Sequence, residues 1–188
     1  ACGNLLNPVN KFRLCNAKGI HGKPIADHVM GFILSHLRCF PVFAEQQKKK
    51  IWKKASSIID ETHEKTVAII GAGDIGKEVA RKCKAFDMRV LGVKRTPNPV
   101  PNVDEVYASE DMDKALEQAD FVVILVPITP ETIHLFNEDR FNKMKKGSYL
   151  INVGRGPVVD EKALVKALES GRLSGAALDV AEVEPLPD

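Results

Sequence analysis

The sequence has little that would suit a membrane span or a nucleic-acid surface. No uninterrupted apolar run approaches the roughly 20 residues that a spanning helix needs, and no signal-peptide pattern opens the chain. Positive charge is not in excess, because 27 Lys and Arg face 25 Asp and Glu, for a net charge of +2. So small a charge does not argue for nucleic acid. We therefore expect a cytoplasmic protein with neither a membrane nor a nucleic-acid partner.

Cysteine is scarce and scattered. The four cysteines, at positions 2, 15, 39 and 83, form no C-x-x-C pair, and no Cys/His cluster has the spacing of a zinc site. We expect reduced thiols and no bound metal. With 44% hydrophobic and 28% charged residues, the 188-residue chain can bury a core without such cross-links.

The apolar residues follow two kinds of pattern. After Pro24 they recur every three or four residues, which predicts a helix from Pro24 to Phe40 that Pro41 ends or bends. From Thr66 onward, short apolar runs alternate with amphipathic segments, which predicts an α/β fold: a doubly wound parallel sheet with helices on both faces. The predicted strands are Val67–Ile70, Arg89–Val93, Phe121–Val126, Tyr149–Val153 and Gly175–Asp179, with a minor one near Val106. The predicted helices are Ile75–Phe86, Met112–Gln118, Glu138–Met144 and Glu161–Ser170.

A glycine-rich turn joins the first strand to its helix. Gly71, Gly73 and Gly76 have the G-x-G-x-x-G spacing, with a strand before them and a helix after them. The first glycine allows a tight turn, the second lets a pyrophosphate lie against the backbone, and the third lets helix and strand pack closely. The helix amino end, with Asp74 and Ile75, then presents free N–H groups to phosphate. This context predicts a dinucleotide-binding site of the Rossmann type.

The end of the second strand selects between the two nicotinamide dinucleotides. An acidic residue there binds the ribose 2′-hydroxyl of NAD, whereas a basic one accommodates the 2′-phosphate of NADP. The position falls at Lys94, followed by Arg95 and Thr96, with no carboxylate. Two cations and a hydroxyl favour NADP over NAD. The alternative is that these are exposed loop residues that impose no strong preference.

Four longer blocks stand out along the chain: Asn16–His28, Ala119–Thr132, Met144–Gly156 and Ala176–Pro187. With these blocks the chain resembles the D-isomer-specific 2-hydroxyacid dehydrogenases from about residue 16 to 187. The early block corresponds to the family's entry into its interdomain helix, although Asp27 stands where the family usually has Glu. The third block is the most diagnostic.

Reduction of a 2-keto acid explains the polar residues in these blocks. Arg155 follows a predicted strand end, where ligands of such sheets bind, and its planar fork suits a carboxylate and an adjacent carbonyl. The resemblance implies that role for Arg155, rather than a surface ion pair. It also implies that Asp179 contacts the nicotinamide end of the cofactor and that Glu184 orients a catalytic histidine. The remaining implied cofactor contacts are Val126, Pro127, Thr132, Val153 and Gly154, together with Arg155.

The catalytic histidine itself is not expected in this chain. The family has it some tens of residues after the glutamate, and none of the five histidines stands in that motif. Their default interpretation is surface exposure or core packing. The chain should therefore bind cofactor and turn over very poorly by itself. The histidines are His21, His28, His36, His63 and His134.

Both ends look like cuts through a larger protein. We expect residues 1–23 to be a remnant of the substrate-binding domain, and residues 24–188 to be the dinucleotide-binding domain with its leading interdomain helix. The resemblance implies a homodimer, with the early helix and Phe43–Trp52 as contacts. The basic stretch at 46–54 otherwise fits a solvated helix end.

The predicted activity is that of an oxidoreductase: reversible, NAD(P)-dependent reduction of a 2-keto acid to a D-2-hydroxy acid. Two alternatives stay open. One is a dinucleotide-sensing, corepressor-like interaction protein on the same fold. The other is a 3-hydroxyacid dehydrogenase, against which the block from Asn152 to Gly156 argues.

Overall fold

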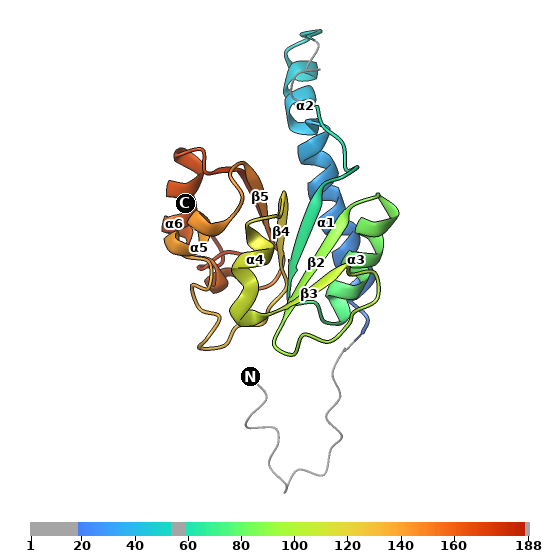
Figure 1. Cartoon of the computed structure of the whole chain (residues 1–188). Helices are drawn as coiled ribbons and strands as arrows, with labels where there is room; N and C mark the ends of the chain where they lie inside the picture. The colour runs from blue at the N-terminus through green and yellow to red at the C-terminus, as the bar shows by residue number, and fades with distance from the viewer. Residues whose placement is uncertain (1–18, 54–58, 187–188) are drawn as a thin grey trace, which may run out of the picture.

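The computed structural model describes residues 19–53 and 59–186, so most of the expected remnant at 1–23 lies outside the described residues. Six strands form one parallel sheet in the order β3-β2-β1-β4-β5-β6. This order confirms the predicted doubly wound sheet (Figure 1). The strands are β1 Thr66–Ile70, β2 Arg89–Lys94, β3 Glu105–Ala108, β4 Phe121–Ile124, β5 Ser148–Asn152 and β6 Leu173–Leu178.

Helices cover both faces of the sheet, as Figure 1 shows. The two faces bury alternate residues of each strand: in β1, Val67 and Ile69 pack with α1 and α3, while Ala68 and Ile70 pack on the side of α4, α5 and α6. All of β1 is buried, which explains its unbroken apolar run. The helices are α1 Gly22–Leu37, α2 Phe40–Lys48, α3 Asp74–Ala85, α4 Met112–Leu116, α5 Glu138–Lys143 and α6 Glu161–Glu169, with short 3₁₀ turns η2 Ser109–Asp111 and η3 Gly156–Val158.

Helix α1 packs on α3 through the stripe that its periodicity predicts. Val29 and Ile33 are fully buried, and Lys82 of α3 reaches across to pair with Asp27 and to donate to the carbonyl of Lys23. The helix ends earlier than predicted, at Leu37, because Cys39 adopts a left-handed conformation with φ of 54°. Pro41 stands in the first turn of α2, where its missing N–H costs nothing, so it begins the next helix.

Helix α2 extends away from the sheet as an arm (Figure 1). None of its residues is buried. The sheet with its two helix layers therefore carries the core, and the arm presents side chains to the surroundings. Within the described residues, no helix is long and apolar enough to cross a bilayer.

Candidate dinucleotide-binding site

The turn after β1 is shaped by Gly71. Its φ of +104° is a conformation that side chains rarely adopt, and an added Cβ would lie 3.0 Å from the carbonyl carbon of Leu125. The N–H groups of Gly71 and Ala72 both donate to the carbonyl of Val93, at 2.9 and 3.1 Å. The turn is thereby attached to the end of β2 and lies against the end of β4.

The other two glycines differ in what surrounds them. An added Cβ at Gly76 would lie 2.9 Å from the carbonyl oxygen of Gly71 and 3.2 Å from a methyl of Ile69, so this residue keeps α3 close to β1. An added Cβ at Gly73 meets no atom within 4 Å, and Gly73 caps α3 in an extended conformation. The amino end of α3 lies directly behind Gly73, and the first N–H groups of any α-helix have no acceptor within the helix itself. The turn thus leaves open space in front of a helix amino end.

These surroundings predict opposite effects of two alanine substitutions. Gly73→Ala should change the free energy of unfolding by no more than about 1 kcal/mol, since only a helix cap is altered. It should weaken dinucleotide binding about tenfold, because a methyl group fills the space proposed for the pyrophosphate. Gly76→Ala should instead lower the free energy of unfolding by about 1–3 kcal/mol through overpacking. Denaturant titration and dinucleotide fluorescence measure the two quantities; equal affinity in Gly73→Ala and wild type would contradict the assignment.

The loop after β4 holds itself in shape through Thr132. Its hydroxyl donates to the carbonyl of Pro127 at 2.8 Å and accepts from the N–H of Thr129 at 2.7 Å. The hydroxyl is therefore engaged inside the loop that carries the predicted contacts Val126 and Pro127. Thr132 therefore stabilises the conformation of this loop, and the backbone of the loop lies against the glycine turn.

Two cations lie at the end of β2, as expected. The ammonium of Lys94 donates to the side-chain oxygen of Asn98 at 2.6 Å, and Arg95 and Thr96 are exposed. Arg95 also lies near Glu131: the Thr129 hydroxyl, the backbone and the Arg95 charge together lower the pKa of Glu131. The ribose end of the proposed site thus lies between the loops after β2 and β4.

Asn152, the last residue of β5, shapes the loop that carries Arg155. It is fully buried, its amide donates to the carbonyl of Arg155 at 3.1 Å, and its oxygen accepts from the N–H of Gly154 at 3.1 Å. An added Cβ at Gly154 would lie 3.0 Å from the carbonyl oxygen of Val126, so this loop lies directly against the loop after β4. Sequence reasoning missed Asn152, although a polar residue closing an apolar strand is a usable signal.

The Arg155 side chain is exposed at this edge. Its guanidinium donates to the carbonyl of Gly154 at 2.6 Å, and no carboxylate in the described part of the chain forms an ion pair with it. A surface ion pair, the alternative weighed from the sequence, is therefore not what the structure shows. The cation is available to an anionic ligand.

The end of β6 adds two carboxylates. Asp179 is joined to β5 by its backbone N–H, which donates to the carbonyl of Asn152 at 3.0 Å, and its side chain lies 3.2 Å from the imidazole of His28. The carboxylate of Glu184 accepts from the N–H of Ala181 at 2.9 Å. Within the described residues, no histidine bonds to Glu184.

A second histidine–carboxylate pair lies beside the site. His134 contacts Glu182 at 2.5 Å, and the N–H of Glu182 donates to Glu161 at 2.7 Å. These bonds connect the loop after β4, the start of α6 and the segment before Glu184. His134 is exposed, in agreement with its interpretation as a surface residue, and it also connects these loops. In the described residues, no group of three His, Cys, Asp or Glu side chains could hold a metal ion.

The predicted residues therefore follow one another along the carboxyl edge of the sheet. From β2 to β6 the edge carries the cations at 94–95, the glycine turn, the loop after β4, Arg155 and finally Asp179. Ligands of open α/β sheets bind at this edge, where the strand order reverses between β1 and β4. Lys94 and Asp179 lie toward opposite ends of this edge, with the amino end of α3 between them.

Comparison with known proteins also identifies this region as a dinucleotide-binding domain. The family model described as "D-isomer specific 2-hydroxyacid dehydrogenase, NAD binding domain" matches residues 30–188. A glyoxylate reductase of Thermofilum pendens is 40% identical over 178 residues, which are 90% of this chain and 51% of that protein.

Solved structures are similar over the same region. A D-isomer specific 2-hydroxyacid dehydrogenase family protein from Aeromonas salmonicida superposes with a TM-score of 0.88 at 40% identity, over 95% of this chain and 57% of that one. An NADPH-dependent glyoxylate/hydroxypyruvate reductase from Sinorhizobium meliloti, in complex with NADP and sulfate, has a TM-score of 0.81 at 35% identity, over 88% and 53% of the two chains. The chain thus spans about half the length of the relatives it matches.

Proposed function

The chain belongs to the D-isomer specific 2-hydroxyacid dehydrogenase family, and we propose that it is the dinucleotide-binding part of an oxidoreductase that reversibly reduces a 2-keto acid to a D-2-hydroxy acid. The observation that carries this proposal is the Arg155 guanidinium. It lies at the end of β5 without a carboxylate partner among the described residues, on the same sheet edge as the glycine turn. Such a cation suits the carboxylate and carbonyl of a 2-keto acid.

Each residue of the site has a proposed part in this reaction. The turn at Gly71–Gly76 and the amino end of α3 hold the phosphates, and the dinucleotide, when bound, supplies the hydride. Arg155 binds the substrate carboxylate and polarises the carbonyl, stabilising the negative charge that develops on its oxygen. Glu184 orients a histidine, and that histidine protonates this oxygen. We place the histidine in the part of the protein beyond this chain.

We further propose the division of the chain into residues 1–23, belonging to a substrate-binding domain, and residues 24–188, the dinucleotide-binding domain, with the boundary in the first turn of α1. Selectivity for the substrate side chain then arises mainly outside this chain. Glyoxylate and hydroxypyruvate are the first candidates, since relatives are named as their reductases. Phenylpyruvate and branched keto acids complete a panel to be assayed with both dinucleotides on the protein that carries this chain. If no keto acid is reduced while dinucleotide binds, a cofactor-sensing interaction protein replaces this proposal.

The loop after β2 supports a preference for NADP(H). Lys94 and Arg95 offer two cations and no carboxylate at the ribose end of the site, and the Sinorhizobium relative is named as NADPH-dependent. Replacing both cations by alanine should weaken NADPH binding about 10- to 100-fold, because charge-assisted hydrogen bonds to the 2′-phosphate are lost. NADH binding should change less than threefold. Fluorescence titration with both dinucleotides measures this, with Lys146→Ala, an exposed lysine before β5, as control; tighter NADH binding by the wild type would refute the preference.

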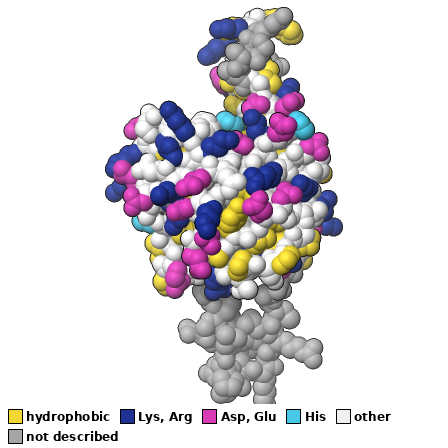
Figure 2. Space-filling view, in the orientation of Figure 1, with side chains coloured by type: hydrophobic (Ala, Val, Ile, Leu, Met, Phe, Trp, Pro, Cys, Tyr) yellow, Lys and Arg dark blue, Asp and Glu magenta, His cyan; other side chains and the backbone are white. Residues whose placement is uncertain are grey.

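We propose a homodimer that uses the arm. Trp52 is 98% exposed, and Phe40, Val42 and Ile51 are 56%, 41% and 51% exposed, so exposed apolar side chains lie at both ends of α2. On the face drawn in Figure 2, the body carries interspersed cationic and anionic side chains, together with hydrophobic side chains in its lower half. Exposed apolar surface of this kind marks an association site. Sedimentation velocity tests the dimer, and Trp52→Glu should shift it toward monomer.

A further inference from the structure

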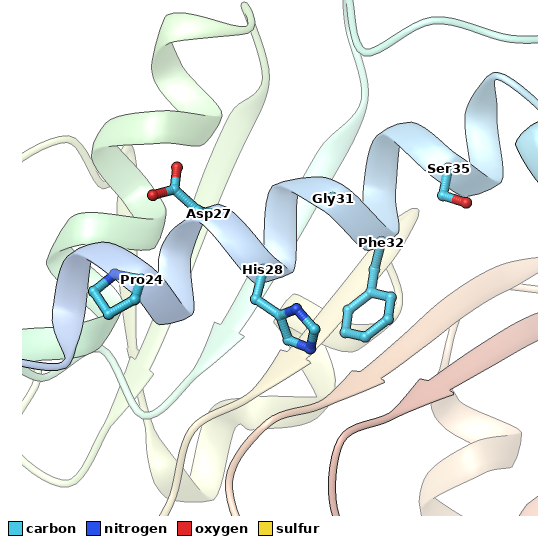
Figure 3. Close-up of a pocket in the computed structure, with 6 residues that line it drawn as sticks. All are labelled: Pro24, Asp27, His28, Gly31, Phe32 and Ser35. Atoms are coloured by element: carbon cyan, nitrogen blue, oxygen red, sulfur yellow. The ribbon is translucent and has the colours of Figure 1, made fainter.

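Helix α1 brings a histidine to the end of β6. The Nε2 atom of His28 lies 3.2 Å from Oδ1 of Asp179, although the two residues are 151 positions apart in the sequence. Both side chains are about half exposed. Figure 3 shows His28 and Phe32 extending from the same side of α1 toward the strands, beside an open groove. The groove is lined by Pro24, Asp27, His28, Gly31, Phe32 and Ser35.

The imidazole is held from two directions. Its ring packs edge-on against the ring of Phe32, one helical turn later, with centroids 4.3 Å apart and planes at 64°. Next to it, Val29 is fully buried between α1 and the sheet, so the backbone that carries His28 belongs to the core. A group fixed on a packed helix positions its partner more precisely than a loop residue does.

We propose that His28 is a positioning residue for the nicotinamide end of the cofactor, a proposal that rests on the dinucleotide-binding function above. Nε2 of His28 donates to Oδ1 of Asp179 and holds this carboxylate in one rotamer. An ionised carboxylate accepts through both oxygens, so Oδ2 remains an acceptor for an amide N–H. The nicotinamide ring carries such an amide. The adenine ribose, at the other end of the dinucleotide, has its proposed binding residues Lys94 and Arg95 at the opposite end of the sheet edge.

The backbone supports the same arrangement. The N–H of Asp179 donates to the carbonyl of Asn152, so the main chain beneath the carboxylate is fixed to β5. The remaining freedom of Asp179 is the rotation of its side chain, and His28 is the partner that the structure shows for that side chain. Removing the imidazole would leave the carboxylate free to turn toward water. This substitution would therefore lower the affinity only of a ligand that reaches Asp179.

The test compares a whole dinucleotide with a fragment that lacks nicotinamide. In the protein that carries this chain, dissociation constants are measured for NADPH by fluorescence and for 2′-phospho-ADP-ribose by competition, and likewise for NADH and ADP-ribose. His28→Leu should weaken dinucleotide binding about tenfold and change fragment binding less than twofold. His28→Gln, whose amide can replace the Nε2 donor, should restore binding to within about threefold of wild type. His63→Leu, at an exposed histidine whose Nε2 lies 3.7 Å from Glu64, is the matched control and should change neither.

The outcomes separate the two proposals. If the wild type binds neither dinucleotide, the proposed function fails. If the wild type binds but His28→Leu weakens dinucleotide and fragment equally, His28 supports the fold only and the positioning role is refuted. Unchanged dinucleotide affinity in His28→Leu, or no recovery in His28→Gln, also refutes it.

Discussion

Replacing Arg155 with lysine is expected to lower kcat/KM for 2-keto acid reduction by about 10²- to 10³-fold, the cost of removing one well-placed donor to a developing oxyanion. Lysine keeps the charge but loses the planar fork that can bind a carboxylate with two parallel hydrogen bonds. In the structure the guanidinium of Arg155 donates to the carbonyl of Gly154, a bond that leaves its other N–H donors for a ligand, whereas a lysine ammonium is a compact point charge. Steady-state kinetics on the protein that carries this chain measure the effect.

The substitution at Arg155 should leave the fold unchanged. Its side chain is exposed and forms no ion pair within the described residues, so thermal unfolding should occur at the wild-type temperature. The matched control is Arg81→Lys on α3, where the guanidinium contacts Glu78 at the surface, and both activity and stability should remain at wild-type values. Near-normal kcat/KM in Arg155→Lys would assign substrate binding to another group.

The second large effect is expected at Gly156, where the loop after β5 meets the segment after β6. An added Cβ there would overlap the carbonyl group of Ala181 and lie 2.6 Å from the nitrogen of Glu182. Backbone cannot yield as a flexible side chain can, so Gly156→Ala should lower the free energy of unfolding by about 3 kcal/mol. For a domain of this size, that corresponds to a Tm lower by about 6–12 °C.

The same substitution should also remove activity in the molecules that remain folded. Gly156 contacts Ala181, whose N–H donates to the carboxylate of Glu184. A displacement of Ala181 should therefore also move that carboxylate. Calorimetry and kinetics measure the two effects. Gly31→Ala is the control, because its Cβ would meet no atom within 4 Å and alanine favours a helix interior by about 0.5–1 kcal/mol. A Gly156→Ala variant as stable as the wild type would contradict the close contact.

Strand boundaries illustrate where sequence reasoning holds and where it stops. The apolar run of β1 predicts the strand almost to the residue, because all of it is buried and its flanks are polar or glycine. The predicted strand Phe121–Val126 ends instead at Ile124. Leu125 still donates to the carbonyl of Ile70, and the backbone of Leu125 and Val126 then lies against Gly71. Strand β6 begins at Leu173, before the predicted Gly175, with a register irregularity opposite Ser148 and Tyr149. Pairing with a neighbour, absent from local periodicity, decides such ends.

The candidate site divides in the same way. Gly71, Gly73, Gly76, Lys94, Arg95 and Arg155 were predicted because each belongs to a short segment that follows a strand which the sequence also predicts. Asn152 and His28 were not assigned to it. The first looks like a strand residue and the second like a helix-surface residue, and only their contacts with Arg155 and Asp179 show otherwise. A motif records neighbours along the chain, whereas these contacts join different elements.

By itself, the sequence determined the alternation of strands and helices, the parallel sheet and the glycine turn, because these depend on local periodicity and on backbone conformations that few residues adopt. Only the tertiary structure decided that Arg155 has no carboxylate partner among the described residues, that Gly156 touches Ala181, and that His28 reaches Asp179 across 151 positions. The reason is physical: such contacts follow from how α1, β5 and β6 pack and which rotamers that packing allows, and neither quantity is written in any local stretch of residues.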